Sequence, residues 1–298
     1  MKDKTLLKYL LWAFGLGWAV QIPAAIFALR GNALIFQGLT MLAMFAPLAA
    51  VILADVPLKS LGWRPRVRGN LRWYLAGWLC PALLCALGAV LYFLLFPARF
   101  DASGSAILAT LSEEAKQQFE AQALPASAFV LLQAVAALSY APFLNTIPSV
   151  GEEAGWRGLM LPRLKERFGR VRGLLLGGVI WGAWHWPLML IAGYEYGLHY
   201  WGAPVLGLLL FCLFTTAMGI LLDELYVKTG SLWAPALAHG AVNACSGLPL
   251  LLLDPAYTDR LTVGPAMIGV IGGLPLLLLA LFVLLKKTPA SAEEADGT

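Results

Sequence analysis

The stretch "APVLGLLLFCLFTTAMGILL", residues 203–222, decides the fold class, because it contains no charged side chain. A helix needs about 20 mainly apolar residues to cross the hydrocarbon core of a membrane. Backbone groups that lie in lipid must be paired within a helix or a closed barrel. Barrel strands alternate apolar and polar residues, whereas this stretch is continuously apolar. It therefore predicts a membrane-spanning α-helix.

Similar apolar runs recur along the chain of 298 residues. The sequence is 60% hydrophobic and 13% charged, whereas soluble domains carry roughly 25% charged residues. The fold class predicted from these runs is all-α, a polytopic transmembrane helix bundle of about eight spans. The eight expected spans are residues 6–29, 33–54, 73–97, 126–147, 173–192, 203–222, 231–252 and 263–285.

Lys and Arg residues concentrate in every second connecting segment, which is the pattern of cytoplasmic loops in membrane proteins. We therefore expect both termini in the cytoplasm of an integral, multi-pass protein in a bacterial-type cell membrane. This orientation also explains the net charge of +4 without nucleic-acid binding. The basic positions are Lys2, Lys4, Lys8, Lys59, Arg64, Arg66, Arg68, Arg72, Arg163, Lys165, Arg167, Arg170, Arg172, Lys228, Lys286 and Lys287.

The remaining segments complete the predicted organisation. The first apolar run continues to about Leu29, which is longer than the roughly 7–15 residues of a signal-peptide core, so we expect an uncleaved span. Residues 105–123 predict an amphipathic helix on the outer face. The four cysteines are expected to be free thiols buried as small hydrophobes. We divide the chain into N-terminal spans with the external helix (1–124), a catalytic core (125–252), a last span (253–287) and a disordered tail (288–298).

The stretch "SVGEEAGWRGLM", residues 149–160, places two carboxylates and a guanidinium in an apolar region. In a structural interpretation, Ser149 and Glu152 form a capping box at a helix start, and Glu153 pairs with Arg157 four residues later. In a functional interpretation, Glu152 lies about 100° around the helix from Glu153 and can accept a proton from water. Ionisable groups inside membrane spans are functional candidates.

The stretch "WGAWHWP", residues 181–187, places His185 inside an expected span. Trp181 is one turn earlier, so its ring and the imidazole share a helix face. Pro187 removes a backbone hydrogen bond and is expected to kink the helix beside His185. The structural alternative is a core histidine that bonds a neighbouring carbonyl.

The stretch "HGAVN", residues 239–243, lies inside another expected span. His239 and Asn243 are four residues apart and share one helix face, and Gly240 permits close helix approach. The structural alternative is polar contact between membrane helices. His199, in contrast, falls in an expected outer loop.

Together the three stretches contain the groups that amide hydrolysis requires. A carboxylate can deprotonate water, and imidazole or amide N–H groups can stabilise the oxyanion that forms. The candidate catalytic residues are Glu152, His185, His239 and Asn243, with Glu153, Arg157 and Trp181 as supporting residues.

In this order, "EEAGWR", "WGAWH" and "HGAVN" resemble the motifs E-E-x-x-x-R, F-x-x-x-H and H-x-x-x-N of CPBP intramembrane proteases. This family includes type II CAAX prenyl endopeptidases and bacterial relatives linked to bacteriocin processing and immunity. The flanking "RGLMLPRL" and "KTGSLWAPALAHG" are also similar to family sequences, and the resemblance covers roughly residues 125–250.

The resemblance implies a role for each matching position. Glu152 is implied as the general base, with His185 binding and activating the water and His239 and Asn243 stabilising the oxyanion. Glu153 and Arg157 are implied to hold the site together. Trp181 stands where the family pattern has Phe, so a difference in pocket shape is expected.

The sequence leaves the cofactor open. The family is often classed with the metallopeptidases, and Glu152, His185 and His239 are ligand types that catalytic zinc accepts. The chain has no H-E-x-x-H motif, and water activated directly by Glu152 and His185 is the alternative that we favour slightly.

The sequence also leaves three hypotheses for the function. The leading hypothesis is an intramembrane endopeptidase whose site opens toward the cytoplasmic half of the bilayer and whose partners are membrane lipids and a peptide or membrane-protein substrate, prenylated or not. A proton-coupled transporter is a second hypothesis, because ionisable groups in spans also mark proton paths. A non-catalytic immunity or scaffold protein is a third, because a fold can host other functions. Oligomeric state is not predicted.

Overall fold

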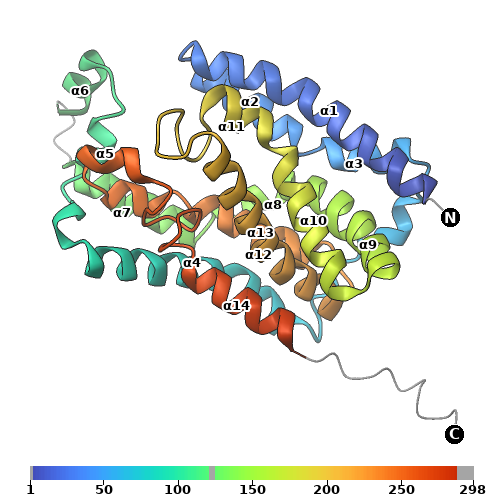
Figure 1. Cartoon of the computed structure of the whole chain (residues 1–298). Helices are drawn as coiled ribbons and strands as arrows, with labels where there is room; N and C mark the ends of the chain where they lie inside the picture. The colour runs from blue at the N-terminus through green and yellow to red at the C-terminus, as the bar shows by residue number, and fades with distance from the viewer. Residues whose placement is uncertain (1–2, 121–124, 287–298) are drawn as a thin grey trace, which may run out of the picture.

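The computed structural model describes residues 3–120 and 125–286, which form an all-helical bundle (Figure 1). Within these residues the only β-type pairing is an isolated bridge between Phe100 and Leu253. The predicted all-α class is confirmed. The predicted disordered tail, 288–298, lies outside the described residues.

Five helical segments of the described chain are long and apolar enough to cross a membrane. Two of them combine consecutive helices, since α2 is followed closely by α3 and α10 by α11. These segments confirm that the chain is an integral membrane protein. The helices are α1 (Lys4–Leu29), α2 (Ala33–Ala43), α3 (Ala46–Leu53), α4 (Leu71–Leu95), α10 (Arg170–Trp184), α11 (Trp186–Ala192) and α12 (Val205–Thr229).

A sixth apolar segment of sufficient length is bent. Helix α7 (Ala126–Leu138) is followed by α8 (Ala141–Gly155), a five-residue π-helical turn, η3 (Trp156–Met160), and α9 (Leu161–Phe168), with a 55° bend between α7 and the α8–α9 unit. In η3 the Leu161 N–H bonds the Trp156 carbonyl. Inserted π turns are often found at functional sites.

The last two predicted spans, residues 231–252 and 263–285, are not continuous helices in the structure. Helix α13 (Trp233–Cys245) has 13 residues and is followed by 3-10 turns, η4 (Leu248–Leu252) and η5 (Pro255–Arg260). Helix α14 (Leu274–Leu285) has 12 residues. Both are shorter than the roughly 20 residues of a full crossing. The described residues thus hold five or six segments long enough to cross a membrane, and the expected count of eight spans is not confirmed.

The remaining elements are short connections. The expected amphipathic helix over 105–123 is divided into two helices by a break, and residues 121–124 lie outside the description. These elements are η1 (Leu58–Leu61), η2 (Pro97–Arg99), α5 (Ser105–Leu108) and α6 (Glu113–Glu120).

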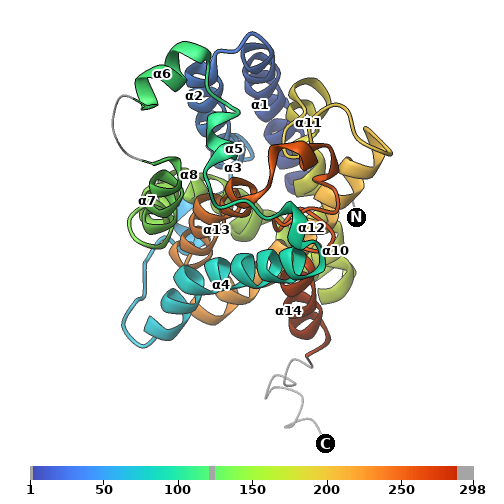
Figure 2. The same ribbon diagram turned by 90° about the vertical axis from the view of Figure 1, so that its left-hand side faces the viewer.

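Helix α13 lies in the middle of the bundle, between α8, α4 and α12 (Figure 2). A Cβ atom on Gly240 would lie 2.6 Å from the Pro142 carbonyl oxygen, so glycine is required for the α13–α8 approach. Gly178 has the same function between α10 and α12, where a Cβ atom would collide with Thr216. These close approaches bring the three polar stretches of the sequence together.

Candidate active site

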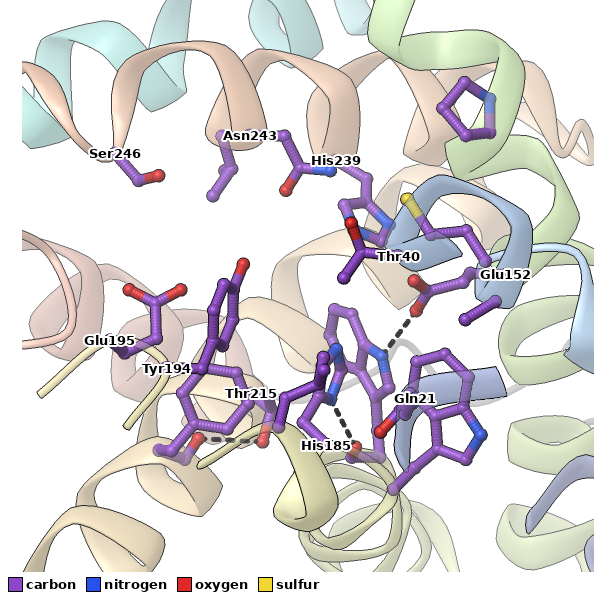
Figure 3. A pocket seen from close by; sticks show the side chains of 18 of the residues that line it. Gln21, Thr40, Glu152, His185, Tyr194, Glu195, Thr215, His239, Asn243 and Ser246 are labelled. Atoms are coloured by element: carbon purple, nitrogen blue, oxygen red, sulfur yellow. Dashed lines mark hydrogen bonds between the residues drawn. The ribbon is translucent and has the colours of Figure 1, made fainter. Parts of the chain in front are cut away.

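A cavity of about 540 Å³ lies between α1, α2, α8, α10, α11, α12 and α13 (Figure 3). Its lining includes all four candidate catalytic residues together with Trp181. Residues that are far apart in the sequence therefore meet at one cavity, as the catalytic hypothesis requires.

Glu152 lies inside α8 and not at a helix start, because α8 begins at Ala141. The capping-box interpretation of Ser149 and Glu152 is therefore wrong. Instead, the indole N–H groups of Trp156 and Trp181 both donate to Glu152 Oε2, at 3.0 and 2.7 Å. The glutamate is 2% exposed and forms part of the cavity wall.

Glu153 and Arg157 form the predicted ion pair, with Arg157 Nη1 donating to Glu153 Oε1 at 3.0 Å. Both side chains are buried. The same Oε1 lies 2.8 Å from His239 Nδ1. An ionised carboxylate only accepts hydrogen bonds, so Nδ1 is the protonated nitrogen of His239 and the ring orientation is fixed.

Trp181 lies against four charged or imidazole groups of the site. Its ring lies 5.3 Å from that of His239 and 6.3 Å from that of His185, and the Arg157 guanidinium lies 4.2 Å from its centroid. Its N–H donates to Glu152. The substitution of Trp for the Phe of the family pattern therefore adds a hydrogen-bond donor as well as volume.

His185 stands at the break between α10 and α11, as expected from Pro187. Its Nδ1 lies 3.0 Å from the Trp181 carbonyl oxygen. Because a carbonyl can only accept, Nδ1 carries the proton, and a neutral ring then presents a lone pair at Nε2. The predicted alternative of a carbonyl-bonded histidine is confirmed for Nδ1, while the ring still lines the cavity.

Asn243 and Ser246 continue the polar face of α13 beyond His239, at spacings of four and three residues. Both line the cavity (Figure 3). Asn243 is exposed, so its amide is available to a molecule in the cavity. His199 is also exposed but is absent from the cavity lining.

The side chains of the site do not form a metal centre. Among residues 3–120 and 125–286, no group of three His, Cys, Asp or Glu side chains is arranged to hold a metal ion. The set Glu152, His185 and His239 therefore does not fit a catalytic metal in this structure. The described cysteines are all free, with Cys80 exposed and the other three buried. The expectation of burial is thus wrong for Cys80.

Several lining residues were not identified from the sequence, namely Gln21, Thr40, Asn145 and Glu195. Gln21 is fully buried, and neither its Oε1 nor its Nε2 has a hydrogen-bond partner among the described residues. The sequence does contain a signal for this residue, because a polar amide in the middle of an apolar span is a functional candidate. Glu195 lies in the α11–α12 connection with φ of 74°, and nothing in the sequence pattern points to its contact with the cavity.

The geometry defines a class of protein: a membrane-embedded helical bundle in which a buried carboxylate and two imidazoles line one cavity. Residues 128–245 match the family model described as Rce1-like type II CAAX prenyl endopeptidase. A segment of 55 residues, 18% of this chain, is 34% identical to CAAX prenyl protease 2 of Methanococcus maripaludis. The alignment spans 20% of that relative's length. The resemblance identified from the motifs is confirmed over this part of the chain.

Proposed function

We propose that this protein is an intramembrane endopeptidase that hydrolyses a peptide bond of a polypeptide segment entering the cavity. The observation that supports this most strongly is the convergence of Glu152, His185, His239 and Asn243 on one cavity. The Rce1-like match over the same helices supports the same reaction class.

In the proposed first step, Glu152 takes a proton from a water molecule whose oxygen attacks the substrate carbonyl carbon. The two indole donors fix Glu152 Oε2, and no hydrogen bond from a described residue occupies Oε1, which is the proposed proton acceptor. The lone pair at His185 Nε2 accepts a hydrogen bond from the same water and orients it. General base catalysis of this kind contributes typically 10²–10⁴-fold to the rate.

In the proposed second step, Asn243 and His239 stabilise the tetrahedral oxyanion. The Asn243 amide donates directly. His239 donates from Nε2 when its ring carries two protons, while the Glu153 carboxylate accepts the hydrogen bond from Nδ1. The proton held by Glu152 then passes to the leaving amine as the C–N bond breaks. No step requires a metal ion.

The proposed experiment compares membrane-protein termini in cells that carry the wild-type protein or Glu152→Gln. The substitution keeps the side-chain shape and the contacts to Oε2 but removes the base. We expect new termini with the wild-type protein only. If the two sets of termini were identical, endopeptidase activity through Glu152 would be contradicted, and the transporter and scaffold hypotheses would take precedence.

A further inference from the structure

The basic segments of the sequence gather at one end of the bundle, which we call the basic end: residues 55–72, 161–172 and 223–232 with the end of α14. Arg163 pairs with Asp3 at 3.0 Å, and Lys165 pairs with Asp223 at 2.7 Å. Arg170 Nη1 donates to the Leu284 carbonyl at 2.7 Å. In Figure 1, α9 and the start of α1 mark this end at the right.

The opposite end is formed by the other set of connections, residues 30–32, 96–112, 193–204 and 247–262. The Asp101 N–H bonds the Leu252 carbonyl at 3.0 Å, and the rings of Phe36 and Tyr194 lie 6.4 Å apart. We call this the acidic end, because its connections hold fewer cations than carboxylates. The cations of these connections are Arg30, Arg99 and Arg260, and the carboxylates are Asp101, Glu195, Asp254 and Asp259.

The cavity lies toward the acidic end. None of its lining residues belongs to the basic segments, and two of them, Tyr194 and Glu195, belong to the 193–204 connection. The α2–α3 pair contributes lining residues from α2 and from Met44, which follows it. No lining residue comes from α3, which leads to the basic end. In α12 they lie between Phe211 and Met218, before the last turns that lead to the basic end.

Exposure increases along the cavity in the same direction. Glu152 is 2% and His239 4% exposed, whereas Asn243, one turn further along α13, is exposed and Tyr194 is 37% exposed. In Figure 3, Glu152 lies at one side of the cavity, and Ser246, Tyr194 and Glu195 lie at the other. The proposed catalytic carboxylate is thus at the closed end, and the open end faces the acidic connections.

From this arrangement we propose that the cavity takes its substrate from the non-cytoplasmic face of the membrane. Basic loops remain on the cytoplasmic side, so the open end of the cavity faces the other compartment. This inference rests on the proposed endopeptidase function, and it specifies the substrate as a polypeptide segment exposed outside the cytoplasm. It replaces the expectation that the site opens toward the cytoplasmic half of the bilayer.

The test introduces one cysteine at a time into a Cys80→Ser background of the full chain, in which the three remaining cysteines are buried. The label is a membrane-impermeant sulfonated thiol reagent. Ser246→Cys reports on the open end of the cavity, Leu198→Cys on the acidic connection, and Ser60→Cys is the matched control at the basic end. Leu198 and Ser60 are exposed, and Ser246 is partly exposed. We expect Ser246→Cys and Leu198→Cys to react in intact cells and Ser60→Cys to react only after permeabilisation.

Three results overturn the proposal: reaction of Ser60→Cys in intact cells, reaction of Ser246→Cys only after permeabilisation, and no reaction of Ser246→Cys in either state. Labelling requires no cleavage. A protein that labels as expected but processes no membrane protein contradicts the proposed function alone, whereas a cleaving protein with the reverse labelling contradicts this inference alone.

Discussion

The indole N–H of Trp181 donates to Glu152 Oε2 at 2.7 Å, which links a tryptophan of α10 to the proposed general base. Trp156 donates to the same oxygen from the π turn, at 3.0 Å. A phenylalanine, the residue of the family pattern at position 181, has no such donor. The carboxylate in this chain is therefore oriented by two donors on two different helical elements.

Trp181→Phe removes one donor while it keeps an aromatic ring over Arg157. A hydrogen bond to a charged group contributes about 1.5–3 kcal/mol, so we expect kcat to fall roughly 10- to 100-fold with KM little changed. The measurement is steady-state cleavage of an internally quenched peptide by protein in proteoliposomes.

Trp156→Phe removes the second donor to the same oxygen. We expect it to decrease kcat by a similar factor. Wild-type kcat in both variants would show that the indole donors do not position the base.

The Glu153–Arg157 pair is a stability determinant, because both charges are buried and Arg157 shares Glu153 Oε1 with His239. Loss of one partner leaves an unpaired buried charge, which costs about 3–5 kcal/mol. We expect Arg157→Met to lower the unfolding temperature strongly in detergent. Glu152→Gln serves as the comparison and is expected to unfold near the wild-type temperature. Equal unfolding temperatures for wild type and Arg157→Met would contradict the assignment.

Replacing Gln21, unlike replacing Arg157, is expected to stabilise the folded protein. Gln21 lies on the α1 stripe of Tyr9, Ala13, Gly17 and Ala25, which packs against the bundle, and its buried amide has no hydrogen-bond partner within the described part of the chain. Leaving a buried polar group unpaired costs about 1–3 kcal/mol.

Gln21→Met, which has similar length, is therefore expected to raise the unfolding temperature. Because the amide lines the cavity, we also expect a severalfold higher KM for the quenched peptide. A destabilised Gln21→Met protein would show instead that the amide is satisfied in the folded state.

Much of this arrangement could be predicted from the sequence, because continuous apolar runs and the spacing of basic residues depend only on the local chain. The Glu153–Arg157 pair was predictable for the same reason, since it is set by helical spacing. The interior position of Glu152 was not, because Ser149 and Glu152 match a local cap motif that the helix starting at Ala141 overrides.

The shortness of α13 and α14 was not predictable either, because apolar composition persists through the turns that follow α13 and the irregular chain that precedes α14. The contacts of Gln21 and Glu195 with the cavity depend on helix packing between distant segments, which periodicity does not encode. The tryptophan donors to Glu152 were missed for the same reason.

Glu195 predicts a pH dependence of stability. Burial raises its pKa from 4.5 to about 7, so the folded state keeps a proton that the unfolded state releases. Stability is therefore expected to fall as pH rises from about 4.5 to 7 and to stay lower above it. The effect should be modest, because the side chain is partly exposed and solvent screens it.

Glu195→Gln removes this dependence. We expect its unfolding temperature, relative to wild type, to increase between pH 5 and pH 8 in the same detergent. A difference that is constant across this range would contradict the raised pKa.

Glu152→Gln provides the decisive kinetic comparison for the site as a whole. Purified wild-type and variant proteins are reconstituted with an internally quenched peptide, and product formation is followed together with thermal unfolding of each preparation. The proposed general-base role predicts a decrease in kcat of roughly 100-fold or more with unfolding temperatures that match. Cleavage by the variant at the wild-type rate would contradict the role of Glu152 and, with it, the proposed mechanism.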